Sequence, residues 1–219
     1  MTNPYSMKCI CLPHGFYVCM PAILATIGWL ATLTEDGCNY AFLEGSMVTE
    51  ITTNPDMSFL QVGINSYREP SFSGDSWNID YKELCMEYNV DIVKIDGVWM
   101  FSKVISFMSL VFGGAAVLLI WFSSCFIFSQ STWKWIGCEL LTAAMLKILS
   151  YSWFATSMCG DNNCSLSYGA KADILACVMW FISGILVLLR YPTPKCSNPP
   201  ITTNNATPSE ASIEMPDIT

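Results

Sequence analysis

The sequence predicts an all-α membrane protein: a four-helix transmembrane bundle with a small extracellular, β-rich, disulfide-pinned loop domain. Of the 219 residues, 53% are hydrophobic and only 13% are charged, which is unlike a soluble domain. Four apolar stretches reach the roughly 20 residues that a helix needs to cross a bilayer. They are separated by a long acidic loop, a short turn and a loop with two cysteines. An even number of spans puts both ends of the chain on one side.

We expect the spans at residues 15–33, 98–128, 135–158 and 172–189. The remaining segments are an N-terminal segment (1–14), a first loop (34–97), a turn (129–134), a second loop (159–171) and a tail (190–219). The tail is rich in Pro, Thr, Ser and Asn, a composition typical of disorder. A cleaved signal peptide is an alternative for the first stretch, because Lys8 precedes it. Its apolar core is longer than the roughly 7 to 15 residues of a signal sequence, which favours the uncleaved helix.

Charge and its distribution predict the orientation. Residues 34–97 contain twelve acidic side chains and three basic ones. The short segments on the other side contain basic residues: Lys8, Lys134, Arg190 and Lys195. The positive-inside rule therefore predicts cytoplasmic N- and C-termini, in the plasma membrane or an endomembrane.

Cysteine placement agrees with this orientation. Cys38 and Cys85 lie in the first loop, and Cys159 and Cys164 lie in the second. Disulfides form in oxidising compartments, so we expect the pairs Cys38–Cys85 and Cys159–Cys164. Four cysteines allow three connectivities, and free thiols are a further alternative.

Three further cysteines are candidates for S-palmitoylation, because they lie close to the predicted cytoplasmic ends of the spans. They are Cys9, Cys11 and Cys196. The alternative is that these are ordinary small packing residues.

The first loop has the composition of a folded segment. The alternation in residues 59–65 and the β-branched run in residues 48–53 favour short antiparallel strands. Turn signals lie at residues 54–55 and 73–75, as Asn-Pro and Ser-Gly-Asp are typical of turns.

A stripe of small and polar residues follows the second span at three- and four-residue steps. Its members are Ser102, Ser106, Ser109, Gly113 and Ala116. Such stripes allow helices to approach closely and are usually packing surfaces. The alternative is the lining of a pore.

Three charged residues fall within the last two spans: Glu139, Lys147 and Asp173. Intramembrane charges are costly and are by default a functional hypothesis. We expect the long Lys147 side chain to reach Asp173 and so to join two helices. Two alternatives for Lys147 are a role in an ion or proton pathway and simple contact of its ammonium group with water.

No enzyme is expected. His14 is the single histidine, which argues against histidine-based metal sites and Ser-His relays. We expect no catalytic site, cofactor, bound metal, nucleic acid or small-molecule substrate. The expected partners are membrane lipids and another membrane protein or a second copy of the chain.

Four helices of alternating direction with a disulfide-pinned sheet after the first resemble the claudin and peripheral-myelin-protein superfamily. Gly63-Ile64-Asn65 stands where that family has a Gly-Leu-Trp, and Cys38 and Cys85 are farther apart than its two loop cysteines. In claudin-like proteins, loop carboxylates can favour cations passing between cells. The resemblance extends that role here to Asp56, Glu69 and Asp75.

The second loop is more similar to four-span proteins of diatoms and related algae. The similarity is strongest in the segment 159–170, Cys-Gly-Asp-Asn-Asn-Cys-Ser-Leu-Ser-Tyr-Gly-Ala, followed by Trp180-Phe181. It extends over roughly residues 15–190 and implies the four-span fold, with no established activity.

The function that we expect is therefore non-catalytic protein–protein interaction, as a scaffold, adhesion protein or auxiliary subunit. The alternative is a small ion channel or transporter component, with a polar pathway between the second and third spans.

Overall fold

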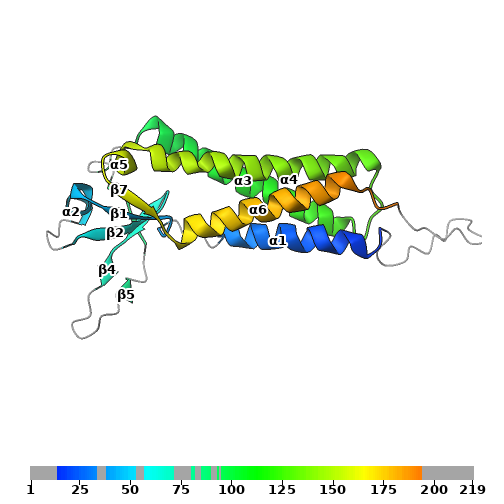
Figure 1. Cartoon of the computed structure of the whole chain (residues 1–219), viewed down its shortest axis with the longest axis horizontal. Coiled ribbons are helices and arrows are strands. Elements are labelled where there is room, and N and C mark those ends of the chain that lie inside the picture. The colour runs from blue at the N-terminus through cyan, green and yellow to red at the C-terminus, as the bar shows by residue number, and fades with distance from the viewer. Residues whose placement is uncertain are drawn as a thin grey trace, which may run out of the picture.

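The computed structural model describes residues 14–33, 38–52, 57–71, 80–81, 85–89, 93 and 95–193. Four long helices lie side by side, and a small sheet covers one end of them (Figure 1). The helices are α1 (Cys19–Leu33), α3 (Gly97–Phe122), α4 (Gln130–Ser150) and α6 (Tyr168–Leu189). Successive long helices alternate in direction. Helix α1 runs toward the cap, and α6 runs away from it (Figure 1).

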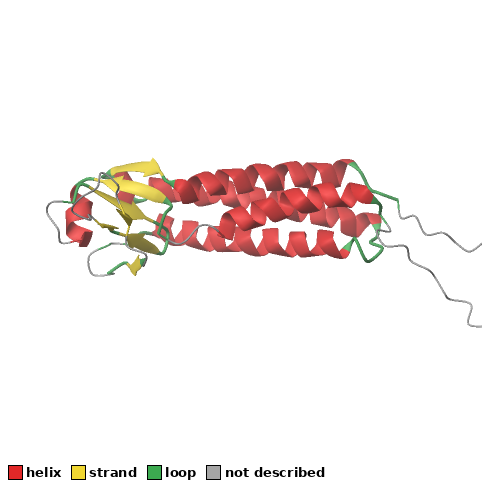
Figure 2. Ribbon diagram, turned by 90° about the horizontal axis from the view of Figure 1, so that it is seen from below, coloured by secondary structure: helices red, strands yellow, loops and turns green. Residues whose placement is uncertain are grey.

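Among the described residues, three segments are long and apolar enough to span a membrane. They are Phe16–Leu33, which includes the 3-10 turn η1 (Phe16–Val18), then Gly97–Phe122 and Tyr168–Leu189. This is consistent with an integral membrane protein. Helix α4 is not one of the three, because it carries Lys134, Glu139 and Lys147 within 14 residues. It nevertheless packs against both α3 and α6, and the long helices run side by side in one bundle with the sheet at one end (Figure 2).

The helix boundaries differ from the expected ones at the turn between α3 and α4. Helix α3 ends at Phe122 and α4 begins at Gln130, whereas the sequence analysis extended the second span to residue 128 and placed a turn at 129–134. The Ser129 hydroxyl accepts a hydrogen bond from the Thr132 backbone N–H at 3.2 Å. This N-cap starts the helix earlier than hydropathy suggests, because capping depends on a single polar residue.

The other end of α4 and the start of α6 also differ. Helix α4 ends at Ser150 and is followed by the 3-10 helix η2 (Tyr151–Ala155) and the short helix α5 (Ser157–Gly160). The expected third span continued to residue 158. Helix α6 begins at Tyr168, four residues before the expected start at 172.

The sheet is five-stranded and antiparallel, in the order β6-β3-β2-β1-β7. Its strands are β1 (Ala41–Glu44), β2 (Phe59–Val62), β3 (Ser66–Arg68), β6 (Met86–Glu87) and β7 (Asn163–Leu166). A separate two-stranded pair is formed by β4 (Pro70–Ser71) and β5 (Asp80–Tyr81). Strand β7 comes from the second loop and pairs with β1. The described residues of 38–93 and 156–167 therefore form one domain, which we call the cap.

The expectation of strands in residues 48–53 was wrong. Residues Ser46–Thr52 form the helix α2. Val48 and Ile51 are three residues apart and both are buried in the core of the cap. Their position on one helical face outweighs the strand preference of β-branched side chains, which is a weak and context-dependent tendency. The turns expected at 54–55 and 73–75 lie outside the described residues.

Two disulfides hold the cap, and both join the predicted partners. Cys38 bonds to Cys85, and Cys159 bonds to Cys164. A cluster of aromatic side chains connects the cap to the helices. Trp99, in the first turn of α3, packs edge to face on Trp153 at 5.8 Å between ring centroids. Its indole N–H donates to the Ile64 carbonyl at 2.9 Å, so the cap is fixed to the bundle rather than linked loosely to it.

Candidate functional site

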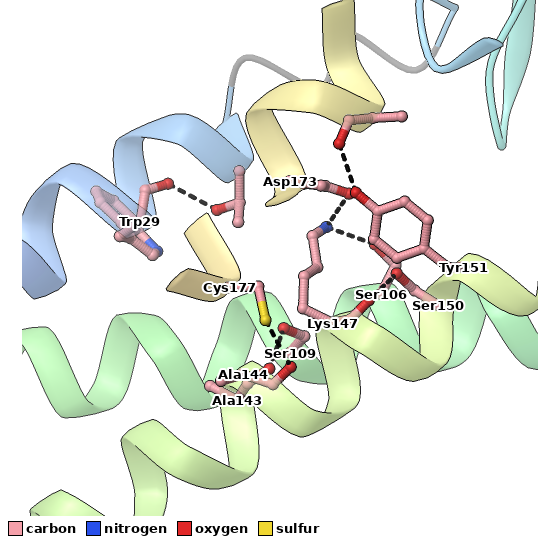
Figure 3. A network of polar contacts seen from close by, with 12 residues as sticks. Trp29, Ser106, Ser109, Ala143, Ala144, Lys147, Ser150, Tyr151, Asp173 and Cys177 are labelled. Carbon is pink, nitrogen blue, oxygen red and sulfur yellow. Dashed lines mark hydrogen bonds and ion pairs between the residues drawn. The ribbon is translucent and has the colours of Figure 1, made fainter. Parts of the chain in front are cut away.

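A buried ion pair lies in the bundle near the cap. The Lys147 Nζ is 2.8 Å from Asp173 Oδ2, and the two side chains are 1% and 0% exposed. The same Nζ donates to the Ser106 hydroxyl at 3.1 Å. The group joins α3, α4 and α6 (Figure 3).

The helix directions explain why these charges meet. Lys147 is in the last turn of α4, and Asp173 lies near the start of α6. Because α4 and α6 are antiparallel neighbours, the end of one lies beside the start of the other. A cation near a helix C-terminus and a carboxylate near an N-terminus are both favoured by the helix dipoles. The structure therefore contains the Lys147–Asp173 contact that the sequence analysis expected.

The surrounding polar groups are also hydrogen-bonded. The Ser150 hydroxyl donates to the Lys147 carbonyl at 2.7 Å, and the Tyr151 hydroxyl donates to the Ala170 carbonyl (Figure 3). Buried polar groups are costly unless they are paired. Here the pairs tie the end of α4 to the start of α6.

Glu139 does not belong to this group. It precedes Lys147 by eight residues on α4, which is about 12 Å along a helix. Its side chain is half-buried, and no ion pair to it is found among the described residues. The structure thus separates the two ionisable residues of α4.

The small-residue stripe of α3 faces the other helices. The Ser109 hydroxyl donates to the Ala143 carbonyl at 2.9 Å, and Ser102 and Ser152 share a hydrogen bond at 2.8 Å. Ala116 is fully buried. The indole ring of Trp180 lies directly against Gly113, where a Cβ would collide with it. These contacts are those of a packing surface.

Trp180 is at the centre of this packing, although the sequence pattern indicated it only as part of a motif. It is fully buried, its indole N–H donates to the Ala25 carbonyl at 3.1 Å, and it also lies against Gly28. A tryptophan in the middle of a span, with glycines on two other spans, is a signal that could have indicated this contact. The rotation of each helix about its axis decides which glycines face Trp180, and this rotation cannot be predicted from the sequence.

A cavity of about 480 Å³ lies beside the ion pair, between the cap ends of α1 and α3. Lys147 and Ser106 form part of its wall, and Lys103 is a second lysine there. The rest of the lining is mainly apolar: Thr32, Leu33, Ile64, Asn65, Met100, Val104, Phe107 and Leu110. This volume is in the range of about 300–1,000 Å³ that is usual for small-molecule sites. No feature of the sequence indicated it.

At the opposite end of the bundle, His14 is 4% exposed. Its Nδ1–H donates to the Pro192 carbonyl at 2.6 Å, and its Nε2 accepts from the Phe128 N–H at 3.2 Å. The ring stacks on Trp133, with centroids 5.9 Å apart. His14 thereby joins the start of η1, the turn after α3 and the chain that follows α6.

The lipidation candidates Cys9, Cys11 and Cys196 lie outside the described residues, as do Asp56 and Asp75. Glu69 is described and partly exposed. In the part of the chain that the structure describes, no three His, Cys, Asp or Glu side chains are grouped so that they could hold a metal ion.

The sequence was also compared with known proteins. No protein-family model matches this chain, and no curated protein matches it at a significant level.

Proposed function

We propose that the chain is a four-span membrane protein that acts by binding other proteins through its cap, without catalysis. The observation that carries this proposal is the Lys147–Asp173 pair. The most deeply buried charge of the bundle is neutralised by a partner and joins two helices. A structural role therefore explains this charge: it helps to hold together the helix bundle that supports the cap.

The same pair supports the proposal that helix α4 is the fourth span. Lys147 faces inward, while large apolar side chains of α4 are exposed on the outside of the bundle. These are Trp135, Met145, Ile148 and Leu149. A charge that is buried against a partner does not face lipid, so the low hydropathy of α4 is compatible with a membrane position. Four spans of alternating direction put both described ends of the chain on one side.

The proposed orientation places the cap outside the cytoplasm. Residues 34–97 are strongly acidic, and both disulfides lie in the cap, as is usual for oxidising compartments. The N- and C-termini are then cytoplasmic. The membrane is either the plasma membrane or an endomembrane.

The cap offers a specific surface to a partner. Strand β7 lies at one edge of the five-stranded sheet, and the nearby side chains of Leu166 and Tyr168 are exposed. Open strand edges are common sites for pairing with another chain, and exposed apolar side chains beside them add affinity. We propose this edge as the contact surface for another membrane protein or a second copy of the chain.

Crosslinking in native membranes, followed by affinity purification of the full chain, tests this function. A single membrane protein in fixed ratio is expected, or a discrete oligomer of the chain itself. Leu166→Lys and Tyr168→Ser should remove that partner. The control Glu87→Lys, on the opposite sheet edge, should leave it bound. If no partner is recovered in a fixed ratio, or if both edges tolerate substitution equally, the proposal fails.

A small channel or transporter component is the second candidate. The observation that favours it is the cavity, which reaches Ser106 and Lys147 from the side of α3. Flux through liposomes that contain the purified chain tests it. The double variant Lys147→Met/Asp173→Leu should abolish flux while the chain remains folded, if this pair lines a pathway.

A further inference from the structure

The cavity beside the ion pair borders a second hollow on the side of the cap. This second hollow, of about 330 Å³, shares the lining residues Ile64, Asn65, Met100 and Lys103 with the first. Its remaining lining consists of Glu87, Tyr88, Ile95 and Trp99. We call the two hollows together the cleft. It runs from the sheet to the apolar sides of α1 and α3.

The two halves of the cleft differ in polarity. The bundle half is lined by apolar side chains of α1 and α3, such as Leu33, Val104 and Phe107. Val104 and Phe107 are exposed, so this half opens on the outer surface of the bundle. The cap half contains Glu87 and Asn65. A cleft with one apolar and one polar half suits an amphiphile that enters from the membrane.

The charge at the junction of the two halves is positive. Lys103 lines both hollows, is exposed, and makes no ion pair with any of the described residues. Lys147, the other lysine of the cleft, is already neutralised by Asp173. Among the described residues that line the cleft, Lys103 is therefore the lysine without an ion pair, and Glu87 is the carboxylate of the cap half.

We propose that the cleft binds one membrane lipid whose head group carries an acidic phosphate or carboxylate. The acidic group pairs with Lys103, and an acyl chain lies against Val104, Phe107 and Leu110 between α1 and α3. Two sources share this chemistry, namely phospholipids and free fatty acids. The site is independent of whether the cap also binds a protein.

Native mass spectrometry of the full chain in detergent tests the proposal. The probes are phosphatidylglycerol, oleate and diacylglycerol, which has acyl chains but no acidic group. One equivalent of phosphatidylglycerol or oleate is expected to bind at least about fivefold more tightly than diacylglycerol, the effect of one lysine near a membrane surface. Preference for phosphatidylglycerol identifies a phospholipid site, and preference for oleate identifies a fatty-acid site.

Two pairs of variants separate the charge from the apolar half. Lys103→Met should reduce the affinity for the acidic lipids to that for diacylglycerol, and Lys103→Arg should retain it. The matched control Lys134→Met removes an exposed lysine at the other end of the bundle and should change nothing. Val104→Trp should weaken the binding of all three lipids, because the larger side chain fills the apolar half of the cleft. Val178→Trp, on the exposed side of α6, should leave their binding unchanged.

The proposal is overturned if diacylglycerol binds as tightly as the acidic lipids. It is also overturned if Lys103→Met and Lys134→Met have the same effect, which indicates general attraction of lipid to basic residues. Lys103→Met is expected to bind diacylglycerol as the original chain does, and this retained binding excludes misfolding as the reason for its loss of the acidic lipids.

Discussion

The two ends of the bundle are stabilised by different chemistry. At the cap end, a buried ion pair joins α4 to α6, two disulfides hold the cap, and a cluster of tryptophans and tyrosines connects the cap to the helices. A cleft remains open there between α1 and α3. At the opposite end, His14, Trp133 and Tyr191 close the bundle through hydrogen bonds to backbone carbonyls.

This difference shows where the chain has room for a ligand. At the His14 end, side chains from three segments that are far apart in sequence fill the space between the helices and satisfy the backbone of the turns. At the cap end, covalent bonds and charge hold the structure, so that α1 and α3 can remain apart without loss of the fold. The following predictions test this contrast, starting with the largest effect.

Breaking the buried ion pair should have the largest effect. Lys147→Met leaves the Asp173 carboxylate buried without its partner, which should cost about 3–5 kcal/mol in the free energy of unfolding. The double variant Lys147→Met/Asp173→Leu should recover most of this loss. Reversible unfolding of the purified chain in mixed micelles measures both. Equal losses in the single and double variants would contradict a structural role for the pair.

The two disulfides should differ in their contributions. The Cys38–Cys85 bond joins residues that are 47 positions apart in the sequence, and the Cys159–Cys164 bond joins residues that are 5 positions apart. Chain-entropy arguments give about 4 kcal/mol for the first and about 2 kcal/mol for the second. Replacing each pair with serine and measuring cap unfolding by hydrogen exchange should show this order. The His14 end should keep its protection in both variants.

Removing the His14 ring should destabilise the opposite end. His14→Ala leaves the Phe128 N–H and the Pro192 carbonyl without their partner, which should cost about 1–3 kcal/mol. Hydrogen exchange should increase around residues 123–129 and leave the cap unchanged. The exposed control Lys134→Ala should have little effect. A loss that appears first in the cap would contradict the separation of the two ends.

The smallest effect concerns the N-cap of α3. Asp96 accepts hydrogen bonds from the Ser157 and Trp99 backbone N–H groups, at 2.9 and 2.7 Å. Both hydrogen bonds lower the pKa of the Asp96 carboxyl, and the bond from the Ser157 N–H has the larger effect. A carboxyl with a lowered folded pKa contributes stability above its ordinary pKa near 4, and this contribution is lost as the pH falls through the folded value.

Unfolding between pH 6 and pH 2 measures this contribution. Asp96→Asn should make the stability of the chain less dependent on pH in that window. At neutral pH, Asp96→Ala should cost about 1 kcal/mol, as is usual for N-caps. If the pH dependence of Asp96→Asn matches that of the original chain, the carboxylate does not have this role.

Several features could be predicted because they depend on local composition or on a short distance along a helix. The apolar lengths indicated α1, α3 and α6, and the loop positions of the four cysteines indicated both disulfides. Lys147 and Asp173 could be paired because Lys147 lies near the C-terminal end of α4 and Asp173 near the N-terminal end of α6, and these two ends meet in an antiparallel pair of helices. None of these inferences needed the rotation of one helix relative to another.

The features that were missed depend on such relationships. The cleft and the contact of Trp180 with Gly113 arise from helix rotation, for which apolar spans give almost no amphipathic signal. Residues 46–52 became helical because the core of the cap accommodates Val48 and Ile51 on one face. The pairing of β7 with β1 joins residues far apart in the chain, and strand edges do not encode their partners in local sequence.

The β1–β7 pairing has a consequence for the biosynthesis of the protein. Ala41 lies opposite Leu166, a separation of 166 − 41 = 125 residues. At the usual translation rate of about 5–20 residues per second, the ribosome needs roughly 6–25 s to reach the second strand after the first. During that time the edge of β1 that pairs with β7 has no native neighbour, although the other edge can pair with β2. Nascent chains truncated before residue 163 should therefore be the forms that chaperones retain and that quality control degrades.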